Sequence, residues 1–362
     1  MDRHTACGQF RKLSREFESL RSRLSQNRLI PILAGRVRKV KKGMPSKILN
    51  FCLLIICLTV GLNVQAEEAG HRVLLHGNNR LAVIEADGEI SWEMRLGGIH
   101  DIHVLPNGHF LVQQRNREIV DIDPITKKLT SVVDVSKSSR NEGVNVEVHA
   151  FQPIAEGGLM IAESGPGRLI ELDREGQVKK SIPLKREKPH PHHDTRLVRR
   201  TPVGTYLVAH ENDGAIREYD GVTGKVVWEY EIPLFGNERK GGHGPEAFGN
   251  QTFSAVRLRN GNTLIATGNG HSVIEVTPEK KVVWRLSQND LPGIRLAWVT
   301  TLEVLENGNY VIGNCHAGPG QPLLVEVVPS TKKVVWQLDR YEDFGNNVSN
   351  SILLDQVGKA VR

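Results

Sequence analysis

Apolar and polar residues alternate in short runs along most of this chain, and one such run recurs. Residues 223–229 predict a turn followed by a strand that contains Trp228. Closely similar segments lie at 279–284 and 330–336, and a less similar copy lies at 87–92. Four of the five tryptophans therefore occupy one position of a repeated unit. A repeat of this size is typical of stacked or radially arranged units.

The alternation predicts strands from residue 72 to the end, because no segment of about ten residues or more keeps a helical period. Five units of four strands begin at His100, His149, His193, Phe253 and Thr300. Residues 72–96 form three strands without an inner one, and residues 348–355 form one strand alone. These two pieces complete a sixth unit. We therefore predict an all-β chain, a six-bladed β-propeller of four-stranded antiparallel blades, closed by the C-terminal strand joining the N-terminal blade.

Two repeated features have a structural interpretation. The tryptophans of the outer strands are expected to fill the gaps between neighbouring blades. The Asn-Gly pairs at 107–108, 260–261 and 307–308 are expected to form hairpin turns with positive φ.

The charge divides the chain into a basic leader and a mildly acidic body. Residues 1–66 hold 13 basic and 3 acidic residues, whereas the whole chain holds 47 and 41. The body therefore carries more acidic than basic residues, which argues against nucleic-acid binding. Residues 1–43 are interpreted as a disordered basic leader or a start codon assigned too early; a cytoplasmic targeting or nucleic-acid-binding tail is the alternative.

Residues 44–66 have the three parts of a secretory signal, namely a basic start, a short apolar run and a small-residue end at Ala66. Cleavage after Ala66 would leave residues 67–362, the propeller, without a membrane span and place it in the periplasm or outside the cell. Of the four cysteines only Cys315 lies beyond the leader, so the body can form no internal disulfide.

Histidine supplies the candidate chemistry. In an up-and-down blade the longest connections lie on one face, and ten of the 14 histidines map to loops or strand starts on that face. Imidazole suits either a metal site or acid–base catalysis, although each histidine could equally be solvated or cap a strand. The candidate ligand-binding residues are His100, His149, His192, His193, His210, Glu211, His243, His271, Arg295 and His316.

We assign no metal ligand, cofactor or catalytic residue from the sequence. Residues 189–194 resemble a metal-binding tract only weakly, because adjacent side chains of an extended segment point in opposite directions. The sequence has no P-loop, nucleophile elbow or His-Glu-x-x-His motif.

The phrase Gly-Lys-Val-Val-Trp-Glu at 224–229 resembles the repeat of PQQ-like (quinoprotein-dehydrogenase-like) propellers. The phrases at 100–111 and 192–194 resemble inner strands of bacterial arylsulfotransferases, which are exported six-bladed propellers in which a channel histidine carries the sulfuryl group. The resemblance spans residues 72–355. Quinoprotein dehydrogenases have eight blades and often an adjacent Cys pair, and arylsulfotransferases have an N-terminal β-domain. This chain departs from both patterns.

We therefore expect an exported binding or scaffold module that presents a His-rich loop face to a small ligand or a protein partner. The resemblance leaves two alternatives open. The first is an arylsulfotransferase-like enzyme, with His193 or His271 as nucleophile and Arg295 near the oxyanion. The second is a PQQ-dependent dehydrogenase.

Overall fold

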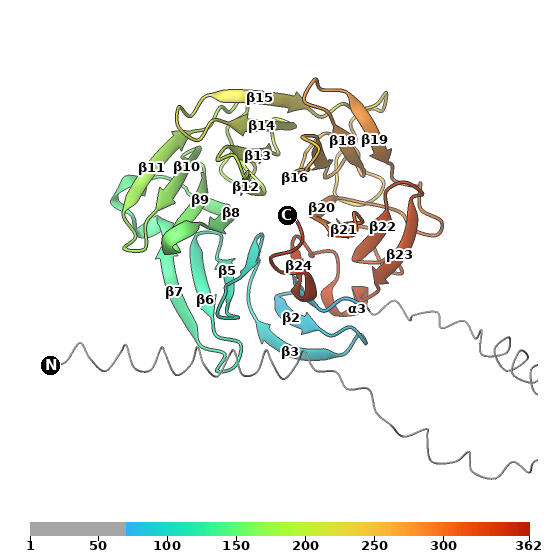
Figure 1. The fold of residues 1–362 in the computed structure, drawn as a ribbon, viewed down its shortest axis with the longest axis horizontal. Coiled ribbons are helices and arrows are strands. Elements are labelled where there is room, and N and C mark those ends of the chain that lie inside the picture. The colour runs from blue at the N-terminus through green and yellow to red at the C-terminus, as the bar shows by residue number, and fades with distance from the viewer. Residues whose placement is uncertain (1–69) are drawn as a thin grey trace, which may run out of the picture. The chain divides into compact units, whose positions relative to one another are not determined.

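A computed structural model describes residues 70–362, which form six four-stranded antiparallel sheets arranged as blades around a central axis (Figure 1). The predicted leader and signal segments, 1–43 and 44–66, lie outside the described residues. The predicted six-bladed β-propeller is confirmed.

The blades follow one another in chain order, except that the first is completed by the last strand. The closing blade contains β24 (Ser351–Leu353), β1 (Val73–Gly77), β2 (Arg80–Ile84) and β3 (Ile90–Arg95). The second and third blades contain β4 (Ile102–Val104), β5 (Phe110–Gln114), β6 (Glu118–Ile122), β7 (Leu129–Asp134), β8 (Glu147–Pro153), β9 (Leu159–Ser164), β10 (Arg168–Leu172) and β11 (Val178–Pro183).

The remaining three blades repeat the same inner-to-outer order. They contain β12 (Val198–Arg200), β13 (Tyr206–His210), β14 (Ala215–Tyr219), β15 (Val226–Glu231), β16 (Ser254–Arg257), β17 (Thr263–Ala266), β18 (Val273–Val276), β19 (Val282–Leu286), β20 (Val299–Val304), β21 (Tyr310–Asn314), β22 (Leu324–Val328) and β23 (Lys333–Leu338). Short helical turns that the alternation did not predict lie in the connections: η1 (Val135–Lys137), η2 (Ser139–Asn141), η3 (Ala155–Gly157), α3 (Tyr341–Phe344) and η4 (Leu354–Gln356).

The ring closes as predicted. Strand β24 pairs antiparallel with β1, and Leu353 lies opposite Val73 while Ser351 lies opposite Leu75. Because β24 supplies the inner strand of the first blade, the first and last strands of the described chain are joined in one sheet.

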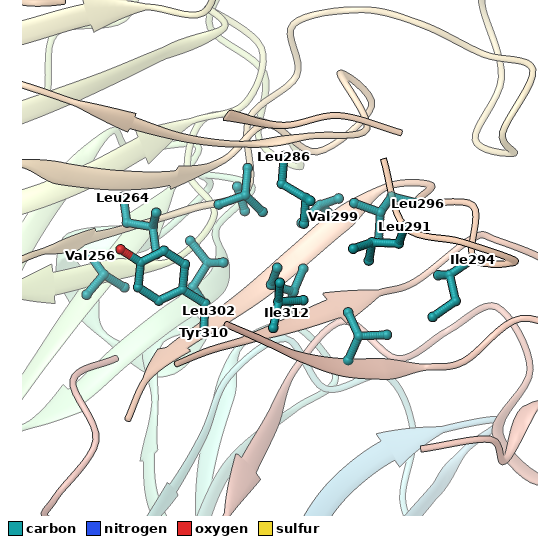
Figure 2. Close-up of a cluster of buried hydrophobic side chains, with 14 of the residues drawn as sticks. Val256, Leu264, Leu286, Leu291, Ile294, Leu296, Val299, Leu302, Tyr310 and Ile312 are labelled. Atoms are coloured by element: carbon teal, nitrogen blue, oxygen red, sulfur yellow. The ribbon is translucent and has the colours of Figure 1, made fainter. Parts of the chain in front are cut away.

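The core consists of apolar clusters between neighbouring blades, not of one central core. On β17, Leu264 and Ala266 belong to the cluster shared with the next blade, whereas Ile265 belongs to the cluster shared with the preceding one. Figure 2 shows the former cluster, with Leu264 near Leu302 and Tyr310 of the next blade. Period-2 alternation within a fully buried strand thus supplies two different interfaces.

The outer-strand tryptophans bridge adjacent blades, in agreement with the structural interpretation. The indole N–H of Trp92 donates to the carbonyl oxygen of Pro124 at 2.7 Å. Trp284 donates in the same way to Pro329 at 2.9 Å. In both cases the acceptor lies in the turn before the outer strand of the following blade, so the repeated indole holds neighbouring blades together as well as burying area.

The Asn-Gly turns differ from the expectation in one detail. Positive φ occurs at Gly108, Gly261 and Gly308 but not at the preceding asparagines. The Asn107 side-chain oxygen instead accepts the N–H of His109 at 3.1 Å. Each asparagine thus stabilises the turn through its side chain, and the glycine takes the left-handed conformation.

Candidate functional site

A cavity of about 530 Å³ opens on the face that carries the long connections. It is lined by loops of five blades, namely the connections from an outer strand to the next inner strand and those between the second and third strands. The lining residues are His76, Asn78, Asn79, Gly98, Ile99, His100, His192, His193, Arg196, Glu211, His243, Phe253, Trp298, Cys315, His316, Asn346, Asn347 and Ser349.

The structure brings six of the ten candidate residues to this cavity: His100, His192, His193, Glu211, His243 and His316. Residues that are more than 200 positions apart in the sequence, such as His100 and His316, thus line one site. The other four candidates, His149, His210, His271 and Arg295, do not line it.

His210 is a structural residue. Its side chain is buried, Nδ1 lies 3.1 Å from the carbonyl oxygen of Asp194, and Nε2 lies 3.0 Å from the hydroxyl of Tyr219. A neutral ring donates to the first and accepts from the second. Burial and the nearby Arg217 guanidinium lower the pKa of His210 to about 3, which keeps the ring neutral.

His271 supports the cavity wall from behind. Nε2 lies 2.6 Å from the carbonyl oxygen of Ala247 and donates to it, and Nδ1 accepts the backbone N–H of Trp298 at 3.0 Å. Trp298 has φ +51°, an unusual conformation for a bulky residue. Nδ1 of His271 therefore holds Trp298 at the cavity while Nε2 is bonded to Ala247, and neither nitrogen remains free for nucleophilic attack.

Arg295 also does not fit the role of an oxyanion ligand in the cavity. Its side chain is about half exposed, and Nη1 lies 3.6 Å from a carboxylate oxygen of Glu246. The transferase arrangement that pairs Arg295 with His271 is therefore not formed.

A buried ion pair forms one wall of the cavity. Glu211 is 1% exposed and Arg196 is 5% exposed. The Glu211 carboxylate contacts the Arg196 guanidinium, and its other oxygen lies 3.1 Å from Nδ1 of His193. Burial alone would raise the pKa of Glu211, but the charges and hydrogen bonds of Arg196 and His193 together outweigh burial and lower the pKa. Glu211 is therefore a permanent carboxylate at neutral pH.

The Arg196 guanidinium has a hydrogen-bond donor that no acceptor among the described residues satisfies. Its guanidinium stacks over the Phe253 ring with 5.7 Å between the guanidinium carbon and the ring centroid. Within residues 70–362, Nη1 is buried and has no hydrogen-bond acceptor. A buried donor without an acceptor is costly in a folded protein, so this atom is a candidate contact for a ligand.

Two histidines and a tryptophan form another part of the wall. The rings of His243 and Trp298 are 4.8 Å apart, and those of His243 and His316 are 5.3 Å apart. Burial and the neighbouring His243 lower the pKa of His316 to about 4. The His316 ring is therefore neutral at neutral pH, and the three rings together form an aromatic surface that also carries imidazole nitrogens.

Glu147, His149 and His192 converge beside the cavity. Oε2 of Glu147 lies 3.0 Å from Nε2 of His149 and 2.7 Å from Nδ1 of His192. Their ligand atoms all lie within 4.8 Å of one another, a spacing that could hold a metal ion. The hydrogen bond from His149 contributes most to lowering the Glu147 pKa to about 2. Burial, followed by Arg196, lowers the His149 pKa to about 4.

Comparison with known protein families shows to which family the repeated units belong. A family model described as outer membrane protein assembly factor BamB matches residues 77–338. The chain belongs to this PQQ_2 family. The match covers more than half of the chain and includes strands of all six blades. It therefore confirms the predicted relationship to PQQ-like propellers. The comparisons do not show the resemblance to arylsulfotransferases.

One similar solved structure supports the fold of this PQQ_2 member. A protein of unknown function from Bacteroides caccae is similar with a TM-score of 0.62 and 23% identity, over 78% of this chain and 98% of that one. Virginiamycin B lyase from Staphylococcus aureus has a TM-score of 0.45 and 12% identity, over 66% of this chain and 69% of that one. A search of curated proteins gives no match.

The family name raises the question of pyrroloquinoline quinone. This cofactor carries three carboxylates and therefore needs several cationic partners. Arg196 is the one arginine or lysine that lines the cavity formed by the described residues, and it is already paired with Glu211. The cavity of this PQQ_2 member does not fit the cofactor.

Sequence reasoning missed Arg196 and Phe253. A signal for Arg196 was present, because it precedes an inner strand whose neighbours are buried, and a charged residue there needs a partner. Phe253 had no such signal, since an apolar residue at the start of an inner strand is expected to be core. Among residues 70–362 we find no helix with the length and hydropathy needed to span a lipid bilayer.

Proposed function

We propose that this propeller is a binding module whose channel-mouth cavity takes a small ligand with one anionic, acceptor-rich group. The observation that carries the proposal is Arg196, a buried arginine that lines the cavity and whose Nη1 lacks an acceptor among the described residues. A carboxylate or phosphate oxygen would satisfy that donor and gain a charge-assisted hydrogen bond.

The size and lining of the cavity support this proposal. A volume of about 530 Å³ falls in the usual range for small-molecule sites, roughly 300–1,000 Å³. Phe253 and Trp298 supply apolar surface beside Arg196, and His193 and His316 supply imidazole nitrogens. A ligand with an aromatic or apolar body and a single negative group matches this wall.

A calorimetric titration of the full chain with sodium benzoate tests the proposal. Replacing Arg196 alone would leave Glu211 as an unpaired buried charge. The informative variant is therefore the double substitution Arg196→Met with Glu211→Gln, which removes both charges. The matched control is Arg257→Met with Glu218→Gln, because that ion pair lies outside the cavity.

We expect saturable benzoate binding to the natural protein and to the control, and a loss of at least about tenfold in affinity in the Arg196/Glu211 variant. No saturable binding to the natural protein would overturn the proposal. So would equal affinity in the two double variants. Inorganic phosphate as a second probe shows whether the aromatic part of the ligand contributes.

We also propose that the propeller acts in the periplasm or outside the cell. Support comes from the apolar run before Ala66 and from membership of a family described as an outer membrane assembly factor. Intact-mass measurement of the protein purified from its own cells tests the expected cleavage after Ala66. A mass that retains residues 44–66, with the protein in the cytoplasmic fraction, would contradict export.

Scaffolding of a protein partner is the second candidate, and the family match over residues 77–338 favours it. The test is complementation of a deletion strain, read as the level of outer membrane proteins. A scaffold acting through its outer surface predicts full complementation by the Arg196/Glu211 double variant. Failure of the variant, with the Arg257/Glu218 control complementing, would tie the phenotype to the cavity instead.

A further inference from the structure

We infer that Glu147, His149 and His192 bind a divalent first-row transition ion of the Zn²⁺ type at the wall of the cavity. The inference goes beyond the proposed function, because an ion can bind here whether or not the cavity takes an anion. It rests on the convergence of three ligand atoms, on the groups that hold them, and on a hydrogen-bonding conflict at His149.

The three side chains come from two adjacent parts of the ring. Glu147 and His149 lie two residues apart on β8, and His192 lies in the loop before the next blade. Their contacts of 3.0 and 2.7 Å meet at one carboxylate oxygen. Ligand atoms of a tetrahedral zinc ion, each about 2.0–2.2 Å from the metal, are separated by about 3.3 Å. For an ion to bind, the contacts of Glu147 with His149 and with His192 would therefore open by about 0.3 and 0.6 Å.

Outer hydrogen bonds already orient two of the ligands. Nδ1 of His149 lies 3.2 Å from the backbone carbonyl oxygen of Thr195. The side-chain amide of Asn116 donates to Oε2 of Glu147 at 3.2 Å. Metal-ligating histidines usually donate their second ring N–H to a carbonyl or carboxylate, and ligating carboxylates are themselves hydrogen-bonded. Both features are present here.

His149 faces an acceptor at each ring nitrogen. The acceptors are the Thr195 carbonyl at Nδ1 and the Glu147 carboxylate at Nε2. A neutral imidazole has one N–H, so it satisfies one acceptor and directs a lone pair at the other. A cation between Nε2 and Oε2 removes the conflict while the ring stays neutral.

The ligand types select the ion. Two imidazoles and one carboxylate suit zinc and neighbouring transition ions, whereas calcium and magnesium prefer sets made only of oxygen. Three protein ligands leave a fourth position for water. The His100 ring lies edge-to-face against His149 at 4.7 Å, and its buried Nδ1 has no partner in the described chain. That nitrogen is available to a metal-bound water.

The test uses the full chain, freed of metal with a chelator, loaded with Zn²⁺ and dialysed. We compare the natural protein with Glu147→Gln and His192→Ala, and with Asn116→Ala as an outer-sphere change. His109→Ala is the matched control, because the His109 ring pairs with Asp121 and lies outside the cluster and the cavity. Far-UV circular dichroism checks that each variant folds.

We expect one retained Zn²⁺ equivalent in the natural protein and an unchanged affinity in His109→Ala. The affinity should fall at least about tenfold in Glu147→Gln and His192→Ala, and about ten- to hundredfold in Asn116→Ala. No retained ion, or an equal loss in His109→Ala, would overturn the site. If the variants misfold, the Co²⁺-loaded natural protein decides. Weak visible bands without a near-ultraviolet thiolate band support these nitrogen and oxygen ligands, and a strong thiolate band contradicts them.

Discussion

Arg199 donates two hydrogen bonds of 2.8 Å to the two carboxylate oxygens of Asp101, although the two residues lie two blades apart. Asp101 also accepts the backbone N–H of Phe151 at 3.1 Å and the side-chain amide of Asn350 at 3.0 Å. One fully buried carboxylate thus connects four blades near the axis. Burial alone would raise the Asp101 pKa, but the charges and hydrogen bonds of Arg199 and His103 together outweigh burial and hold the pKa well below its usual range.

Removing Arg199 should destabilise the ring strongly. In Arg199→Met the Asp101 charge stays buried without its partner, a change that costs about 3–5 kcal/mol of unfolding free energy. Guanidinium denaturation at pH 7 measures the loss. The double variant Arg199→Met with Asp101→Asn should regain most of it, because no buried charge remains. A single variant as stable as the natural protein would show that the pair does not join the blades.

Closure of the ring should depend on the last strand. Leu353 is fully buried in the cluster between the first and last blades, so Leu353→Ala should cost about 2–5 kcal/mol. Val357 lies four residues further on and is 38% exposed, so Val357→Ala should change the stability by less than about 0.5 kcal/mol. Equal denaturation midpoints for these two variants would contradict the pairing of β24 with β1.

The inter-blade tryptophans should contribute through their N–H groups. Trp284→Phe keeps an aromatic ring but removes the donor to Pro329, and we expect a loss of about 0.5–1.5 kcal/mol. Val283, the exposed neighbour on β19, provides the control as Val283→Ala. Thermal unfolding resolves the difference. An unchanged midpoint in Trp284→Phe would mean that the hydrogen bond to Pro329 adds no stability beyond that of the packed ring.

His210 should make the stability depend on pH. Its folded pKa is about 3, against roughly 6.5 in the unfolded chain, so the unfolded state takes up more protons between these values. The stabilisation is therefore complete above pH 6.5 and is lost as pH falls. Between pH 7 and 5 this one residue should account for about 2 kcal/mol. His210→Gln should flatten the profile by that amount, and an unchanged slope would contradict a neutral buried ring.

The fold was predictable because the sequence patterns that indicate strands and turns are local and repeat along the chain. Turn residues and alternation mark the strands, and the tryptophan at 92, 228, 284 and 336 marks four of the six outer strands. The missing strand of the first blade predicts closure. The convergence of histidines followed from topology, since it depends only on which connections share a face. The direction in which each side chain points could not be predicted from the topology. His210 and His271 turn inward to bond with backbone groups, and the meeting of Glu147 with His192 depends on the path of a loop.

The central claim is that the channel-mouth cavity binds an anionic ligand at Arg196. The most direct measurement is a crystal structure of the full chain with 4-bromobenzoate, in which anomalous scattering locates the bromine. We predict the carboxylate at Nη1 of Arg196 and the bromophenyl ring beside Phe253 and Trp298. Bromine density found only outside this cavity, at a ligand concentration that saturates the calorimetric titration, would contradict the account.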